Sequence, residues 1–153
     1  MNREILFRAK RVDNGEWVEG YLMDENYINV PFNDDDVCGR FDDPAEVDPE
    51  TVCQYTGLKD KNGREIFEGD IAKLILPDGE IRYFKVSIKS VTRKVLCHPD
   101  FNDESANVEI TGIIFEWRGY ELLPCVDTYG APDYEMMEVV GNAIDNPELL
   151  EGI

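Results

Sequence analysis

The sequence has no long hydrophobic run. None of its apolar stretches approaches the roughly 18 to 20 residues that are needed to cross a bilayer. The opening residues, Met1 to Glu4, do not lead into the hydrophobic stretch of a signal peptide. We therefore expect a cytoplasmic protein that makes no contact with a membrane.

Histidine and closely spaced cysteines are scarce, which weighs against metal and thiol chemistry. The four cysteines, at positions 38, 53, 97 and 125, are spaced too widely for a CxxC zinc motif and are too few for a disulfide scaffold. Any Ser-His or Cys-His pair would have to use His98, the single histidine. Its neighbour Cys97 would point to the opposite face of a strand. We expect reduced thiols, and we assign no catalytic and no metal-ligating residue.

Signatures of ligand binding are also missing. The chain has neither a GxxxxGK[ST] nor a GxGxxG phosphate-binding motif. A calcium loop of the EF-hand type beginning at Asp34 would have Cys38 as its fifth residue and Ala45 as its twelfth, where a bidentate Glu is required. A loop beginning at Asp100 would end at Thr111 and fails in the same way. We interpret both segments as solvated acidic loops and expect no cofactor, and we expect the protein not to be an enzyme.

Basic residues are outnumbered, 15 to 33, which gives a net charge of −18. Such a charge repels phosphate backbones, so we expect no direct nucleic-acid binding. The acidity lies in two blocks: residues 24–50 carry −9 and residues 98–153 carry −12, whereas residues 51–97 carry +3. The basic strand from Arg82 to Lys94 is interpreted as a contact for the protein's own acidic loops or for a second subunit.

The chain of 153 residues is long enough for one ordinary domain, and its 42% hydrophobic content is sufficient for a packed core. Residues 5–12 and 17–23 alternate like strands around Asn14-Gly15, which predicts a hairpin with a two-residue type I′ turn. The register that follows opposes these pairs: Phe7 and Leu22, Arg8 and Tyr21, Lys10 and Glu19, Val12 and Trp17.

A second hairpin is predicted from residues 72–76 and 80–88, because Pro77-Asp78-Gly79 between them suits a bulged turn. Asn146 and Pro147 predict a short helical turn near the C-terminal end of the sequence. Further strands are expected at residues 51–56, 92–96, 108–117 and 136–143, with a weaker one at 27–30.

These patterns predict a single mainly β domain, residues 1–153. Its antiparallel hairpins would form a small barrel or sandwich. Residues 24–50, which combine acids with prolines and have few large apolar side chains, are expected to be an irregular acidic loop insertion.

One stretch resembles a known family. Residues 54–71, Gln-Tyr-Thr-Gly-Leu-Lys-Asp-Lys-Asn-Gly-Arg-Glu-Ile-Phe-Glu-Gly-Asp-Ile, resemble the central signature of the YopX family, small proteins found mainly in bacteriophages and prophages. The sequence departs from the family pattern at Lys10, because family members often carry a tryptophan at this position, after the Phe-Arg-Ala. Flanking pieces of the sequence match in the family's order: Arg3-Glu4-Ile5, Phe7-Arg8-Ala9, Glu138-Val139-Val140-Gly141-Asn142 and Asn146-Pro147-Glu148-Leu149-Leu150.

The resemblance implies a mainly β, cytoplasmic protein of phage or prophage origin with no established activity and no family catalytic residues. Our favoured hypothesis is a non-enzymatic accessory protein that acts as a protein-interaction or self-associating module, a homo-oligomer with an unidentified protein partner. The first alternative is an acidic DNA mimic that occupies a host DNA-binding protein. The second is a metal-dependent hydrolase that uses acids such as Asp70.

Overall fold

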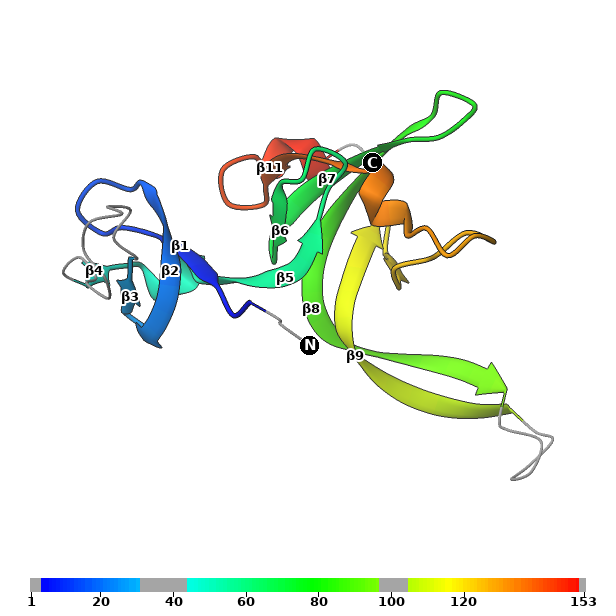
Figure 1. Ribbon diagram of the computed structural model, residues 1–153, viewed down its shortest axis with the longest axis horizontal. Helices are drawn as coiled ribbons and strands as arrows, with labels where there is room; N and C mark the ends of the chain where they lie inside the picture. Colours follow the sequence, from blue (N-terminus) through cyan, green and yellow to red (C-terminus); the bar gives the residue numbers. More distant parts are fainter. Residues whose placement is uncertain (1–3, 31–43, 97–104, 152–153) are drawn as a thin grey trace.

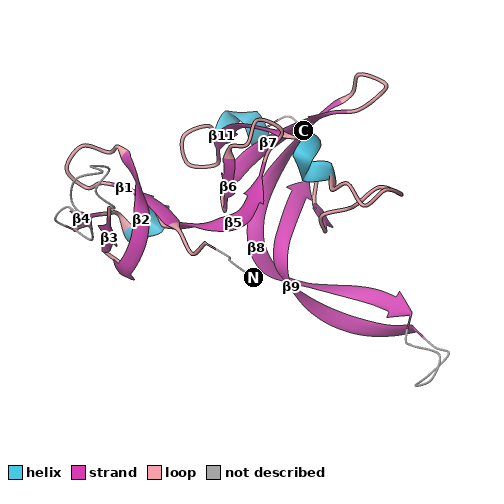
Figure 2. Cartoon of the chain, in the orientation of Figure 1, coloured by secondary structure: helices cyan, strands magenta, loops and turns pink. Residues whose placement is uncertain are grey.

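The computed structural model describes residues 4–30, 44–96 and 105–151 and shows two antiparallel sheets (Figures 1 and 2). The mainly β prediction is confirmed. The sheets are open, so the closed barrel, one of the two predicted architectures, is wrong. The helical segments that the structure describes are short 3-10 turns, and none of them has the length and apolar character needed to cross a membrane.

The first sheet has six strands in the order β4-β3-β2-β1-β5-β6. Its strands β1 to β4 lie away from the second sheet, and β5 continues from them toward it (Figure 1). The bounds are β1 (Phe7–Lys10), β2 (Trp17–Asp24), β3 (Tyr27–Asn29), β4 (Ala45–Glu46), β5 (Cys53–Lys59) and β6 (Glu65–Phe67).

The second sheet has five strands in the order β10-β9-β8-β7-β11. Three 3-10 turns complete the described elements: η1 (Pro49–Thr51), η2 (Asp133–Met136) and η3 (Pro147–Leu150). The strand bounds are β7 (Asp70–Ile75), β8 (Ile81–Leu96), β9 (Ser105–Trp117), β10 (Tyr120–Leu122) and β11 (Glu138–Asn142).

The first hairpin forms as predicted, but its register is two residues away from the predicted one. Arg8 lies opposite Glu19 and Lys10 opposite Trp17. The turn has four residues, and of the predicted pair Asn14 and Gly15 only the glycine has a positive φ, 71°, so the type I′ turn is wrong. The Asn14 side chain accepts the Glu16 N–H at 2.9 Å, which favours the wider loop. A shift of two leaves every side chain on its predicted face, so the hydrophobic pattern could not detect it.

The second hairpin is confirmed. β7 and β8 pair from Ile71 and Lys85 to Ile75 and Ile81, and the turn between them places Gly79 at a φ of 90°. The strand expected at residues 92–96 is the end of β8 and not a separate element.

The helical turn expected near the C-terminal end is confirmed as η3. Asn146 precedes it and Pro147 begins it, as predicted. The Asn146 side chain makes no capping bond, because its oxygen accepts the N–H of Asn142 at 3.3 Å instead.

The segment predicted to be an irregular acidic insertion, residues 24–50, contains regular structure at both ends. β3 pairs with β2 and β4, so the expectation of an irregular segment is wrong for these residues and the weaker strand prediction at 27–30 is confirmed. Ile28 and Ala45 are the physical reason, because both are fully or almost fully buried and pack in one cluster with Ala9 and Val47. Residues 31–43 lie outside the described part of the chain.

The largest core cluster joins the two sheets. Ile66 of β6 packs against Phe84 and Phe115 of the second sheet, together with Met137 and Val139. Phe84 and Phe115 meet edge to face, with ring centroids 6.2 Å apart. The family-like central segment is therefore where one sheet is packed on the other.

β8 and β9 extend well beyond this core. They pair without a break from Lys85 and Glu116 to Leu96 and Ser105. Their distal halves, residues 89–96 and 105–112, project from the body as a curved two-stranded ribbon (Figure 1), and no other described strand pairs with them. We call this part of the molecule the ribbon.

Candidate functional site: the junction between the sheets

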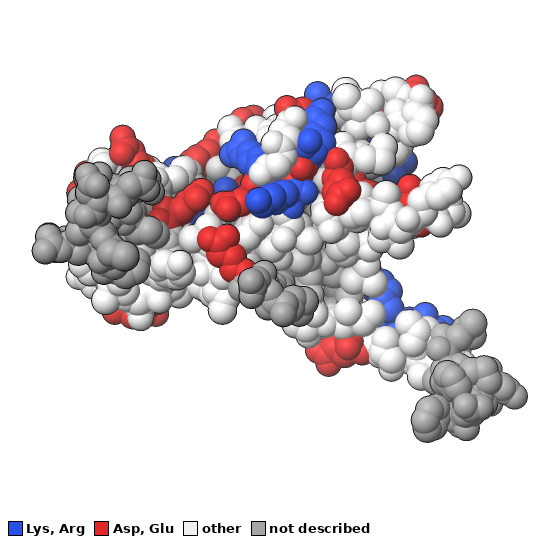
Figure 3. Space-filling model, viewed as in Figure 1, with Lys and Arg blue, Asp and Glu red and all other residues white. Residues whose placement is uncertain are grey.

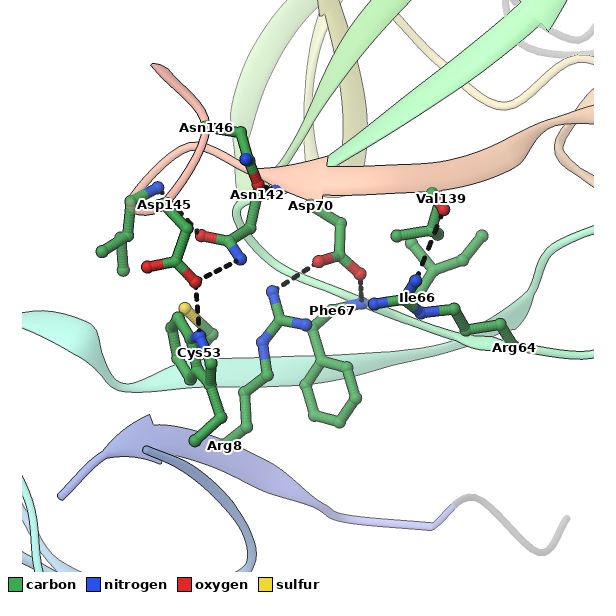
Figure 4. A network of polar contacts seen from close by, with 12 residues as sticks. Arg8, Cys53, Arg64, Ile66, Phe67, Asp70, Val139, Asn142, Asp145 and Asn146 are labelled. Carbon is green, nitrogen blue, oxygen red and sulfur yellow. Dashed lines mark hydrogen bonds and ion pairs between the residues drawn. The ribbon is translucent and has the colours of Figure 1, made fainter. Parts of the chain in front are cut away.

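Polar side chains that could take part in chemistry gather between β1 and the first residue of β7 (Figure 4). A guanidinium nitrogen of Arg8, from β1, donates to Oδ1 of Asp70, the first residue of β7. The other carboxylate oxygen accepts the Phe67 N–H at 2.8 Å. The two side chains are 9% and 1% exposed, so this ion pair links the sheets from within the molecule.

The Arg8 guanidinium is enclosed by aromatic rings. It lies 5.0 Å from the centroid of Trp17 and 4.7 Å from that of Phe67. Such stacking suits arginine, whose planar cation is weakly hydrated. Arg8 Nε is buried and has no hydrogen-bond partner in the described structure, so part of the cost of burying this cation is compensated by the rings alone.

Asp70 is the residue that the sequence suggests for a metal-dependent hydrolase, and in the structure it is buried and bonded to other parts of the protein. Burial raises the pKa of its carboxyl, although Arg8 and the Phe67 N–H act in the opposite direction. Both of its oxygens have protein partners. Within the described ranges no three His, Cys, Asp or Glu side chains lie close enough together to hold a metal ion. The carboxylate therefore holds the two sheets together.

A second buried carboxylate, Asp60, organises the turn between β5 and β6. One of its oxygens accepts the N–H groups of Asn62 and Arg64, both at 2.9 Å, and the other accepts the N–H of Val139 on β11 at 2.9 Å. Burial by itself would raise the pKa of Asp60, but these three N–H groups and the charge of Arg64 bring it below its ordinary value. The ionised Asp60 carboxylate thus connects this turn to the edge strand β11 by hydrogen bonds.

A third carboxylate, Asp145, ties the first hairpin to the segment before η3. It pairs with the ammonium group of Lys10 and accepts the Trp17 Nε1–H at 2.7 Å. The Asn142 side chain donates to the same carboxylate at 3.2 Å. The pairing of Lys10 with Glu19 predicted from the sequence is wrong, because the register shift places Trp17 opposite Lys10 and directs the lysine to Asp145.

Asp145 makes the stability depend on pH in a defined range. The hydrogen bonds from Lys10 and Trp17 lower its pKa from 3.8 to about 2. Because the folded pKa is depressed, the stabilisation is complete above the unfolded pKa and is lost as the pH falls from about 4 to about 2. We expect Asp145→Asn to have a lower melting temperature than the wild type at pH 7. The difference in melting temperature between the two should be smaller at pH 2. Thermal scans across this range measure the difference, and a deficit that does not change with pH would contradict it.

The two described cysteines are free thiols in different surroundings. Cys53 is buried, its thiol donates to the Thr51 carbonyl at 3.3 Å, and burial raises its pKa. Cys125 is an exposed free thiol, so both described cysteines are reduced, as predicted. Cys38, Cys97 and His98 lie outside the described residues.

The contacts between the two sheets involve the pieces of sequence that resemble a family signature. Arg8, Asp60, Asp70 and Asn142 all belong to those pieces. Arg8 bonds to Asp70 and Asp60 bonds to Val139, each in another piece, whereas Asn142 bonds to Asp145. A model of the family described as YopX protein matches residues 6–151. The chain belongs to the YopX family. No protein in the curated set matches it.

A solved structure shares the fold of this YopX protein. It is the crystal structure of protein EF1440 from Enterococcus faecalis, 24% identical, with a TM-score of 0.52; the match covers 98% of the present chain and 100% of the other. At this identity the likeness is evidence for the fold alone.

The buried ion pair is not predicted by the sequence. Arg8 sits at an alternate position of the first hairpin, on the face that would be polar and solvated if the hairpin stood alone. Trp17 on the same face is the sequence feature that could have indicated burial, because a large aromatic side chain is unusual on a fully solvated face. The signature residues at the junction are thus bonded to other parts of the protein.

Proposed function

We propose that this YopX protein is a phage- or prophage-encoded, cytoplasmic accessory protein that acts without catalysis, through protein contacts and self-association. The main observation in support of this proposal is the ribbon. A two-stranded ribbon with no third strand is at best marginally stable in water. This one spans eight paired residues in each strand, from Lys89 opposite Gly112 to Leu96 opposite Ser105. A partner that covers it supplies the missing contacts.

The junction supports the same proposal. Arg8, Asp60, Asp70 and Asp145 are the polar groups with the most distinctive environments, and each is engaged in holding segments of the chain together. Because these polar groups hold the fold together, the ribbon is the described feature that we assign to function. This distribution supports a non-enzymatic role.

The DNA-mimic alternative has weaker support. It needs carboxylates at phosphate-like spacing on a rigid surface. Residues 31–43, which hold half of the acids of the 24–50 block, lie outside the described chain. Of the other acids, Asp24 ends β2 and Glu46 ends the two-residue β4. The net charge of −18 still argues against direct binding of nucleic acid.

Shortening the ribbon tests the proposed function. Ser90 and Thr111 face each other at the base of the ribbon, with their hydroxyl oxygens 2.6 Å apart. Replacing residues 91–110 by Asn-Gly closes the two strands with a two-residue turn and leaves Phe84 and Phe115 of the core in place. Sedimentation velocity over a range of concentrations should show oligomers for the wild type and a monomer for the shortened chain. A wild type that stays monomeric up to high concentration would overturn self-association.

A further inference from the structure

An apolar groove lies at the start of the described chain. Ile5 is 64% exposed and stands in a hollow of about 480 Å³ that it shares with Glu4, Phe7, Tyr21 and Leu22. Tyr21 and Leu22 are themselves 47% and 36% exposed. Exposed large apolar side chains that gather in one place are typical of a contact surface.

The groove continues toward the base of the ribbon. Glu4 and Ile5 also line a second hollow of about 360 Å³, whose other wall includes Tyr55 of β5 and Ile88 and Ile113 of β8 and β9. The two hollows therefore adjoin at Glu4 and Ile5, and the second of them lies between the first sheet and the second. We call the two together the groove.

Glu4 lines both hollows, and the charges of Glu19 and Glu65 act close to it. Burial and the nearby charges of Glu19 and Glu4 raise the pKa of Glu65, and Lys59 offsets this only in part. Burial raises the pKa of Tyr55 too, followed by the charges of Glu65 and Glu4. None of the three glutamates forms an ion pair with a described residue. An occupant of this groove that brings positive charge is favoured.

The ribbon has the complementary character. Its described residues include Lys89, Arg93 and Lys94 but one acid, Glu109. Figure 3 shows basic side chains along the ribbon. Its strands alternate, so that one face is apolar, with Val95 38% exposed. From the observed register, that face carries Val91, which is buried at the base of the ribbon, and Val95, Ala106, Val108 and Ile110.

Arg93 lies on the apolar face of the ribbon. Its guanidinium donates to the carbonyl oxygens of Thr92 and Glu121, and it forms no ion pair with a described carboxylate. Lys94 is exposed on the opposite face, also without a described acidic partner. Lys89, at the base of the ribbon, pairs with Glu116 and Glu121 of its own chain. The ribbon therefore combines an apolar surface with two positive charges, Arg93 and Lys94, that have no described acidic partner.

We propose that the ribbon of one copy docks by its apolar face in the groove around Ile5 of a second copy, and that the second copy's ribbon does the same in return. This proposal rests on the self-association proposed above and names its surfaces. The ribbon of each copy projects away from its own body (Figure 1), so the occupant of each groove comes from another molecule. Reciprocal exchange closes a two-fold dimer and stops there, as isologous contacts do.

The size of the contact is adequate. Eight residues at the rise of a β-strand make the ribbon about 25 Å long, and two strands make it about 10 Å wide. One ribbon face therefore covers roughly 250 Å², and two ribbons in two grooves bury about 1,000 Å² in total. This is the area at which specific interfaces begin.

Two substitutions separate the surfaces. Val95→Asp places an acid on the ribbon face that meets the acidic groove, and Ile5→Lys places a base in the groove that meets the basic ribbon. Each symmetric dimer contains the damaged contact twice, so we expect the dimer Kd from sedimentation equilibrium to rise about 100-fold for each variant, about tenfold per contact.

Matched controls carry the same charges elsewhere. Thr92→Asp puts an acid on the opposite, exposed face of the ribbon, and Ile75→Lys puts a base at a residue that is 53% exposed in the second hairpin. Both should leave the Kd within a factor of about three. Melting temperatures show whether each variant is folded; if Val95→Asp or Ile5→Lys unfolds, Ala106→Asp and Leu22→Lys change the same two surfaces.

Mixing the two damaged variants is the decisive measurement. In a mixed dimer one ribbon and one groove are intact and face each other. The other contact brings the acid introduced by Val95→Asp against the base introduced by Ile5→Lys, so the two new charges attract each other. We expect the mixture to associate at least about tenfold more tightly than either variant alone. No gain on mixing would overturn the exchange.

The outcomes distinguish this inference from the proposed function. If Val95→Asp weakens the dimer and Ile5→Lys does not, the ribbon docks elsewhere, including on another ribbon, and only the groove assignment is overturned. If Ile5→Lys alone acts, the groove receives a different segment and the ribbon assignment fails. A strictly monomeric wild type would overturn both.

Discussion

Replacing Asp70 by asparagine lowers the free energy of unfolding by about 4 kcal/mol, the typical result of breaking a buried ion pair from one side. The substitution leaves the buried Arg8 cation without its counter-charge, and the rings of Trp17 and Phe67 replace only part of it. Arg8→Met, which leaves the carboxylate unpaired, has a cost of the same order. Urea unfolding monitored by tryptophan fluorescence measures both.

The double variant Arg8→Met/Asp70→Asn supplies the internal test. Removing both charges leaves no unpaired ion, so its cost should fall short of the sum of the single costs by about 2 kcal/mol or more. Lys61→Met removes an exposed pairing with Glu138, both side chains being more than 40% exposed, and should cost less than about 1 kcal/mol. Additive single costs at Arg8 and Asp70 would show that the pair is not coupled.

Replacing Asp60 by alanine costs about 3 kcal/mol, the second large effect. The substitution leaves the N–H groups of Asn62, Arg64 and Val139 without their acceptor, and each unsatisfied buried donor costs about 1 to 3 kcal/mol before water or relaxation compensates it. β11 loses its bond to the turn, so its amides should also exchange faster with solvent.

Asp78→Ala is the matched control for Asp60. Asp78 also sits in a turn and accepts the N–H of Glu80 at 2.9 Å, but this bond is exposed to water. Its loss should cost less than about 1 kcal/mol. Equal costs at Asp60 and Asp78 would show that the Val139 bond contributes nothing to joining the turn and β11.

The hairpin between β7 and β8 shows how far local sequence reaches. Pro77-Asp78-Gly79 determines the turn, and the alternation after it determines which side chains share a face, because both are properties of neighbouring residues. The first hairpin shows the limit of such reasoning. Its faces were predicted correctly and its register was not, since a slip of two residues changes the opposed pairs without moving any side chain to the other face.

The junction required the tertiary structure. Arg8 and Asp70 are 62 residues apart, and in sequence both belong to strands whose polar positions are consistent with solvent exposure. The hairpin alone pairs Lys10 with Glu19; the structure directs the lysine to Asp145, which is 135 residues away. Partners this distant are determined by how the sheets pack, which local periodicity does not encode.

The sequence by itself determined the mainly β class, both hairpins, the C-terminal helical turn and the family, because turn chemistry, alternation and motif order are all local properties. Only the tertiary structure decided that Asp60 and Asp70 are buried clamps, that the sheets stay open, and that β8 and β9 run on as a ribbon beyond the core. The physical reason is the same in each case. Burial and partner choice depend on which surfaces meet, and those surfaces are brought together from opposite ends of the chain.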